Sequence, residues 1–328
     1  VTGQEDGQAI LEMLERINLF IVPLDNERKW YRYHHLFADL LHQKARQTDL
    51  EQLPSLHRRA SEWYANEGQA SNAIRHALAA EDYDRAADLI ELAWPSWRGP
   101  VELLTWLDWV KGLPDELVRF RPVLSVAVAQ ALLNAGQLEA ANARLLDTER
   151  WLAPKEDQPN DPTMQMVVVD EAQWSVLPIS LATVRAYHAQ AIGNIPGTLQ
   201  YTQRVLDLLP DGNHPLRGPI SMLLGLAYWA SGDLEAAYKN FFEGSAGTDI
   251  QTRISAAFVL AEMKIGLGQL QSALTNCQNA IKLGEQLDVP MPQGMEDVYS
   301  VLSNLHRERG DLEVAAQALV TSKELGQK

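Results

Sequence analysis

Hydrophobic and polar positions follow a helical pattern along most of this chain, and the pattern restarts after recurring glycines. Between residues 129 and 322, an apolar helical stretch, a turn centred on glycine and a second helical stretch follow one another several times. Successive turn glycines lie 57, 39, 36 and 42 residues apart, and they are Gly136, Gly193, Gly232, Gly268 and Gly310. Hairpins of helices at such intervals are typical of solenoid proteins, whose stacked repeats bury one continuous core.

Positions that follow each turn glycine explain how the predicted hairpins close. Glycine suits the left-handed conformation that ends a helix. The second residue after it is apolar and is expected to begin the buried face of the next helix: Leu138, Ile195, Leu234, Leu270 and Leu312. The fifth residue is small, so that the two helices can approach closely: Ala141, Thr198, Ala237, Ala273 and Ala315. The pattern predicts an all-α fold, a tetratricopeptide-like right-handed superhelix of helical hairpins.

The first 48 residues follow a different pattern. A helical stretch over residues 10–17 leads into two short predicted strands, residues 19–24 and 30–33, which flank a polar turn. A further helix is predicted over residues 35–45, with Leu36, Phe37, Leu40 and Leu41 on its packed side. Helix, β-hairpin and helix in this order are typical of the end of a winged-helix domain.

Proline-rich stretches divide the rest of the chain. Residues 153–162 hold three prolines among acidic and amide side chains, so we expect a long exposed loop there, before a helix over residues 167–191. Residues 210–215 and 289–292 are shorter breaks of the same type. The predicted organisation is therefore the C-terminal part of a winged-helix domain over 1–48, a helical junction with the first repeats over 49–152, and tetratricopeptide-like repeats over 163–328.

Composition and charge narrow the possible functions. The 328 residues are 46% hydrophobic and carry a net charge of −15, of which residues 1–80 contribute only −2. The acidic repeats would repel a phosphate backbone, so no direct nucleic-acid contact is expected. No run of about 18 apolar residues predicts a membrane span. The start of the chain does not have the pattern of an export leader, and the single cysteine, Cys277, is expected to be buried and fits a reducing cytoplasm.

Two groupings of side chains have alternative interpretations. His35, Asp39 and His42 share one helical face and could bind a metal, but a capping or hydrogen-bonding role is favoured, so no metal is predicted. Four indoles suggest either a carbohydrate platform or core packing, and packing is favoured: Trp94, Trp97, Trp106 and Trp109. No nucleophile and base stand out together, so we expect no catalytic residues and no enzyme activity in this chain.

Several segments, in order, resemble the MalT-like ATP-dependent transcriptional regulators. They are residues 33–41 (YHHLFADLL), 57–64 (HRRASEWY), 68–80 (GQASNAIRHALAA) and 103–117 (LLTWLDWVKGLPDEL), the last followed by RPVL at 121–124. Such regulators are large LuxR-type activators of the signal-transduction ATPase class. The resemblance covers most of the chain in the family's order.

The resemblance implies a place for the chain within a longer, cytoplasmic protein. Such regulators begin with a P-loop nucleotide-binding domain, continue with a winged helix and a tetratricopeptide-like array, and end with a DNA-binding helix-turn-helix. The chain has no GxxxxGK[ST] phosphate loop and no basic recognition helix at its end. We therefore expect no cofactor in the chain itself, ATP in a preceding domain and DNA binding in a following one.

The resemblance also implies a sensing function for the array. In the family, an inducer or a regulatory protein shifts the full protein between a resting monomer and a self-associated active form. A small-molecule inducer or regulatory protein and further copies of the chain are therefore the expected partners, acting through a population shift. The alternative is a generic tetratricopeptide-like scaffold for protein–protein interaction. Residues 33–41 favour the regulator, because a free-standing scaffold has no need of a winged-helix tail.

First helices of tetratricopeptide-like pairs line the concave face, and positions counted back from the turn glycines give the candidate ligand contacts. Trp229 could stack on a sugar or an aromatic ring, with polar neighbours supplying hydrogen bonds. The alternative is that Trp229 packs against the next repeat and that the polar side chains are solvated. The six predicted positions are Gln130, His188, Trp229, Glu262, Asn304 and Arg307.

Overall fold

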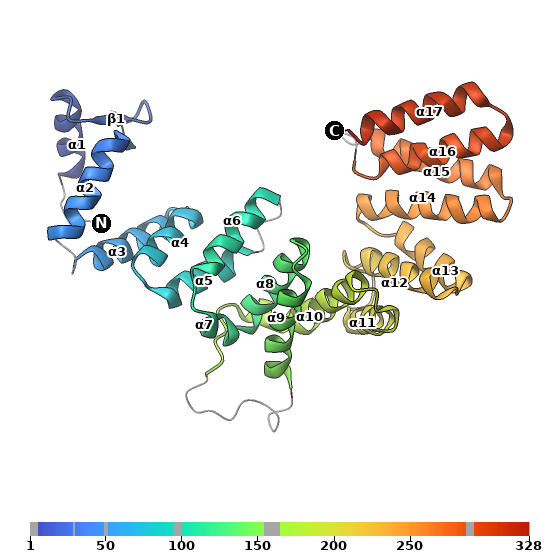
Figure 1. Ribbon diagram of the computed structural model, residues 1–328, viewed down its shortest axis with the longest axis horizontal. Helices are drawn as coiled ribbons and strands as arrows, with labels where there is room; N and C mark the ends of the chain where they lie inside the picture. The colour runs from blue at the N-terminus through green and yellow to red at the C-terminus, as the bar shows by residue number, and fades with distance from the viewer. Residues whose placement is uncertain are drawn as a thin grey trace. The chain divides into compact units, whose positions relative to one another are not determined.

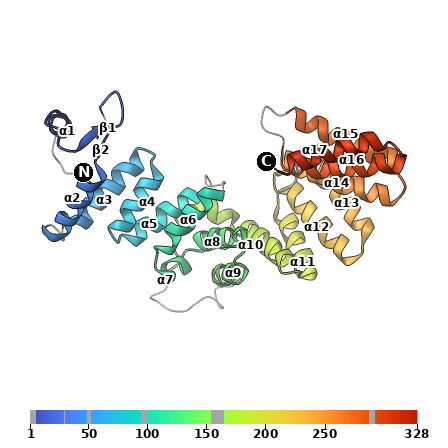
Figure 2. The ribbon, with the colours of Figure 1, turned by 45° about the horizontal axis from the view of Figure 1, so that its top comes forward.

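The computed structural model describes residues 6–28, 30–48, 52–94, 100–153, 165–286 and 292–327. In this part of the chain there are seventeen helices and two short strands (Figure 1, Figure 2). The chain divides into two compact units: unit 1 comprises residues 1–131 and 153–171, and unit 2 comprises residues 132–152 and 172–328. The predicted fold class, all-α with a small N-terminal β-hairpin, is confirmed.

Unit 1 contains the β-hairpin and the first helices. Its elements in chain order are α1 (Gly7–Arg16), β1 (Ile21–Pro23), β2 (Tyr31–Tyr33), α2 (His35–Thr48), α3 (Leu53–Asn66), α4 (Ala70–Ala79), α5 (Tyr83–Ala93), α6 (Pro100–Lys111), α7 (Asp115–Arg119) and α8 (Pro122–Asn134). The last turn of α8 belongs to unit 2.

Unit 2 contains the regular hairpins. Its elements are α9 (Leu138–Leu152), α10 (Glu171–Ala191), α11 (Ile195–Leu208), α12 (Arg217–Ser231), α13 (Leu234–Ser245), α14 (Ile250–Gly266), α15 (Leu270–Glu285), α16 (Met295–Arg309) and α17 (Leu312–Leu325). Each second helix packs against the first helix of its own pair and that of the next: α13 contacts α12 and α14, and α15 contacts α14 and α16. First helices of neighbouring pairs also touch, as α14 does with α12 and α16. Stacked repeats have this pattern of nearest-neighbour contacts.

The turn positions confirm most of the predicted hairpin chemistry. All five turn glycines have a left-handed backbone, with φ between 72° and 87°. The five small residues that follow them are buried, none more than 7% exposed. The five apolar residues each begin the second helix, as predicted, but Leu234 and Leu312 are 55% and 65% exposed, so the prediction that they are buried is wrong. They occupy the first position of their helices, directly after the turn, and the small buried residue of each helix, Ala237 or Ala315, comes one turn later.

Helix α2 buries fewer side chains than its sequence pattern predicts. Phe37 packs its ring against Phe20 and Tyr33, at centroid distances of 5.2 Å and 5.7 Å. Leu36 and Leu40 are 67% and 57% exposed, and Leu41 is also exposed, so their predicted place on the packed side is wrong. The helix turns Phe37 toward the hairpin, and the leucines lie on a face that no described element covers.

The predicted breaks are observed where the structure describes them. Residues 210–215 form the irregular connection between α11 and α12. Helix α10 begins at Glu171 and not at residue 167, because Val167 lies in an irregular segment where its amide donates a hydrogen bond to the Phe120 carbonyl at 2.9 Å. Most of the predicted loop 153–162 and of the break 289–292 lies outside the described residues.

Two of the four indoles, Trp94 and Trp106, pack together in unit 1. Trp106 is fully buried, its Nε1 donates a hydrogen bond to the Ile90 carbonyl at 3.0 Å, and its ring lies 4.7 Å from that of Trp94. This confirms the packing interpretation for Trp106, whereas Trp97 lies outside the described residues. In unit 2, Cys277 is fully buried, as predicted.

Candidate functional site

The six predicted ligand contacts lie on first helices of the hairpins. Gln130 is exposed on α8 in unit 1, and the other five positions belong to α10, α12, α14 and α16 of unit 2. Glu262 and Asn304 are half-buried, and Arg307 is exposed and paired with Glu308 at 3.2 Å. Among the described hydrogen bonds and ion pairs, none joins two of the six. Their role in binding a ligand therefore stays a prediction.

Trp229 and His188 have opposite environments. The Trp229 side chain is 40% exposed, and its ring meets the ring of Phe241 edge to face at 5.9 Å, within its own hairpin. It is therefore supported on one side and free on the other. His188 is only 8% exposed, and its Nε2 lies 3.1 Å from the carbonyl oxygen of Leu138. The contact joins α10 to the start of α9 and leaves His188 little surface for a ligand.

Metal binding finds no support in the described side chains. The His35 ring lies 4.3 Å from that of His34 in a tilted arrangement, and the side chain of His42 lies outside the described residues. Across the part of the chain that the structure describes, no group of three His, Cys, Asp or Glu side chains could hold a metal ion. In the same residues, no helix combines the length and the apolar character that crossing a membrane requires.

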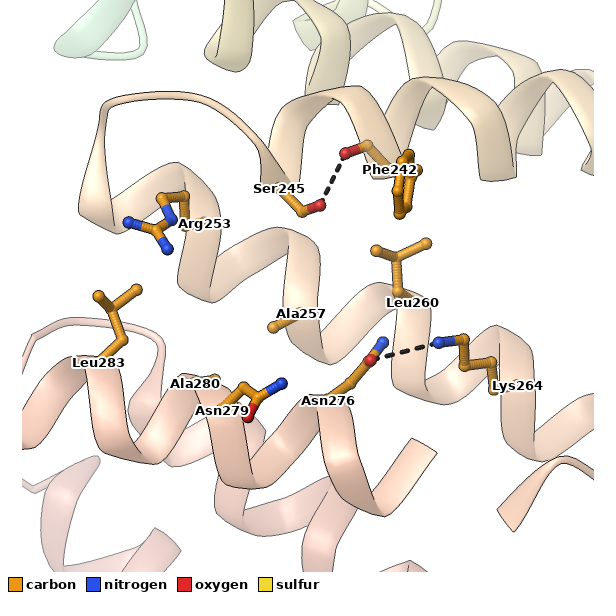
Figure 3. A pocket seen from close by; sticks show the side chains of 10 residues that line it. All are labelled: Phe242, Ser245, Arg253, Ala257, Leu260, Lys264, Asn276, Asn279, Ala280 and Leu283. Carbon is orange, nitrogen blue, oxygen red and sulfur yellow. Dashed lines mark hydrogen bonds between the residues drawn. The ribbon is translucent and has the colours of Figure 1, made fainter. Parts of the chain in front are cut away.

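A groove of about 230 Å³ lies between the second helices α13 and α15, with α14 as its floor (Figure 3). It is lined at helical spacing. The α14 side chains at 253, 257, 260 and 264 form one stripe along that helix, and those at 276, 279, 280 and 283 form one stripe along α15. Phe242 and Ser245 close the groove from α13.

The groove combines cations and amides with an exposed aromatic ring. Lys264 Nζ donates a hydrogen bond to Asn276 Oδ1 at 3.2 Å. Arg253 is half-buried. Phe242 is 60% exposed and also lines an adjacent hollow on α13 of about 590 Å³. None of the ten lining residues is acidic. The sequence analysis considered only the first helices as ligand-binding surfaces and therefore missed this groove. The helical spacing of residues 253, 257, 260 and 264, with a basic residue at each end, could have indicated it.

Unit 1 holds a buried charged cluster that sequence reasoning also missed. Arg121 is 2% exposed, and its Nη1 lies 2.6 Å from Asp88 Oδ1 and 3.9 Å from Glu91 Oε2. Neither carboxyl oxygen of Glu91 has a hydrogen-bond partner in the described chain. Burial raises the pKa of Glu91 to about 7, against the opposing attraction of Arg121. The cluster holds α5 to the segment before α8.

Comparison with known families agrees with both parts of the fold. The model of the MalT winged helix domain matches residues 1–53, and the model of the MalT-like TPR region matches residues 180–328. Together the two matches cover 202 of the 328 residues and support a region of a MalT-like regulator. In this MalT-like chain, the β-hairpin of unit 1 is thus the wing end of the winged helix, and the hairpins of unit 2 form the tetratricopeptide-like region.

Among curated proteins, this MalT-like chain is similar to the serine/threonine-protein kinase PknK. The matches include PknK from two strains of Mycobacterium tuberculosis, CDC 1551 and H37Rv, and from Mycobacterium bovis. Identity is 37% over 131 residues, which is 40% of the chain but only 12% of the length of each kinase. So short a shared segment assigns no kinase activity to the chain.

Proposed function

We propose that the chain is the sensor and self-association region of a MalT-like transcriptional activator. An inducer or a regulatory protein binds the repeats and thereby controls the nucleotide state and DNA binding of the full-length cytoplasmic protein. ATP binds a P-loop domain outside these 328 residues, and promoter DNA binds a helix-turn-helix that is also outside them. The proposal is supported by two family matches in one chain: the winged helix at residues 1–53 and the repeats at residues 180–328.

The stacked hairpins of unit 2 supply a physical route for such control. Among the described residues of unit 2, each hairpin packs on its neighbours, so small rotations between hairpins add up along the stack. A ligand that binds one curvature of the repeats more tightly shifts the population toward that curvature. The equilibrium constant changes by at most the ratio of the ligand's affinities for the two curvatures. Trp229 is the best-placed contact, because its ring is supported by Phe241 and still has an open face.

A thermal-shift screen of sugars and small metabolites tests the proposal. We expect at least one compound to raise the melting temperature of the wild-type chain but not that of W229A. Trp63, which is also 40% exposed but lies on α3, gives the matched control W63A, which should respond like wild type. Equal responses in wild type and W229A would remove Trp229 from the site.

The regulatory part of the proposal needs the full-length protein. A compound found in the screen should increase self-association in the presence of ATP, measured by light scattering, and W229A should abolish the increase. Binding without any change in oligomeric state would refute the sensor role and favour the scaffold alternative.

A further inference from the structure

We propose that the groove formed by α13, α14 and α15 binds an extended peptide segment that carries acidic side chains. The inference goes beyond the inducer site, because none of the side chains that line the groove is among the six first-helix positions. It depends on the charge, the length and the hydrogen-bonding groups of the groove, which Figure 3 shows together.

The charge of the groove selects an acidic ligand. The chain as a whole carries −15, yet the groove contains two cations, Arg253 and Lys264, and no carboxylate. Arg253 is half-buried; its backbone N–H donates to the Asp249 carbonyl, but its guanidinium has no hydrogen bond or ion pair among the described residues. Its guanidinium is therefore partly removed from water with donors unused, and a carboxylate matches those donors. The Lys264 ammonium has only the neutral Asn276 side chain as a described partner.

The distance between the two cations sets the length of the ligand. Arg253 and Lys264 lie on one face of α14, eleven residues apart, so at 1.5 Å per residue their Cα atoms are about 16 Å apart. Figure 3 shows them at opposite ends of the groove. An extended chain advances about 3.3 Å per residue and only alternate side chains share a face, so acidic side chains four positions apart span about 13 Å on one face, and the long side chains of Arg253 and Lys264 cover the remaining distance.

The amides on α15 favour an extended backbone over a helical one. Asn276 and Asn279 lie one turn apart, and Figure 3 places both on the side of α15 that faces α14. An amide side chain can donate and accept at once, which matches the exposed N–H and C=O groups of an extended segment. A helical ligand has already paired these groups internally, so it would leave the amides unused.

Apolar side chains provide an anchor between the two charged ends. The Phe242 ring borders the groove and is 60% exposed, while Ala257 and Leu260 form the floor beneath it. An apolar side chain in the middle of the ligand would remove this ring from water, as the central anchors of protein interfaces do. The expected ligand therefore has an acidic residue at each end and an apolar residue between them.

Fluorescence anisotropy with the 328-residue chain tests the inference. The probe is a pool of labelled pentapeptides with Glu at both ends, Leu at the third position and Ala, Ser or Thr elsewhere, so that all three side chains share one face. We expect saturable binding that weakens at least about tenfold when Gln replaces Glu in the pool, and as much when the protein is R253A/K264A. Arg204 and Lys323 are exposed outside the groove, so the matched variant R204A/K323A should bind as wild type does.

Three results would overturn the inference: equal affinity for the Glu and Gln pools, equal affinity of wild type and R253A/K264A, or displacement of the peptides by inorganic phosphate at concentrations as low as those of unlabelled Glu peptide. The last result would identify a site for small anions. If circular dichroism shows that R253A/K264A is unfolded, F242A replaces it, and unchanged affinity in F242A counts against the inference. Peptide binding that survives in W229A separates this inference from the proposed inducer site.

Discussion

Glu91 is the residue whose chemistry the fold changes most. Its carboxyl group is buried, and its nearest cation, Arg121, is already engaged with Asp88 at 2.6 Å. Burial therefore outweighs attraction, and the pKa rises from 4.5 to about 7. Near neutral pH the folded chain holds a proton here that the unfolded chain has released.

This proton makes the stability of unit 1 depend on pH. Below about pH 4.5 Glu91 is protonated in both states, and as the pH rises to about 7 only the unfolded chain ionises, so stability falls and then levels off. Relative to E91Q, the wild type should lose about 2 to 3 kcal/mol of unfolding free energy between about pH 5 and pH 8. Urea unfolding followed by Trp fluorescence measures the loss. The exposed control E62Q should show no such trend, and a wild-type to E91Q difference that is constant with pH would contradict the argument.

At the residue scale, sequence could predict only what local spacing determines. The small residues after the turn glycines are buried because each hairpin needs a close approach at that point. Glu91 and Arg121 lie 30 positions apart on separate elements, and no helical period connects them. Leu36 and Leu40 were predicted to be packed but are exposed. An amphipathic pattern identifies the apolar face of a helix, but it does not show whether another element covers that face.

At the element scale, the α12–α13 hairpin depends on glycines inside its helices. A Cβ atom added at Gly225 would lie 2.6 Å from Phe241 Cε1, a distance that packed atoms do not tolerate. G225A should therefore destabilise unit 2 by about 1 to 3 kcal/mol, because Phe241 is fully buried and cannot move into solvent. Thermal unfolding followed by circular dichroism measures the change.

Gly266 gives the matched control for G225A. It ends α14, and a Cβ there would meet nothing within 4 Å. G266A should be neutral or stabilising, by up to about 1 kcal/mol, because alanine loses less backbone entropy than glycine in a helix. Equal losses in both variants would mean that the contact with Phe241 is not the cause.

Hairpins were predictable at this scale because the turn glycine, the helix start and the small residue fall within six positions. The start of α10 was not, since Val167 pairs with the distant Phe120 instead of continuing a helix. The groove was missed for a related reason. It joins the second helices of two different hairpins across the first helix between them, a neighbourhood that appears only after stacking.

At the scale of the whole molecule, charge opposes the self-association that we propose. Two chains of net charge −15 repel, and salt screens this repulsion over about 10 Å at 0.1 M. Raising the NaCl concentration from about 50 to 500 mM should therefore strengthen association, which sedimentation velocity would show as a shift toward the dimer. Association that weakens with salt would contradict this and would indicate attractive contacts between unlike charges, such as a basic groove against an acidic face of a second copy.

The buried thiol of Cys277 has a practical consequence. Its side chain is fully buried on α15, and burial raises its pKa to about 12, so the closed protein offers alkylating reagents neither access nor a thiolate. Because the sequence contains no second cysteine, each alkylated molecule has passed through a local opening that separates α15 from its neighbours. The rate of thiol modification thus reports the rate at which the stacked helices open locally. A bound inducer or peptide that stabilises the hairpins will lower that rate.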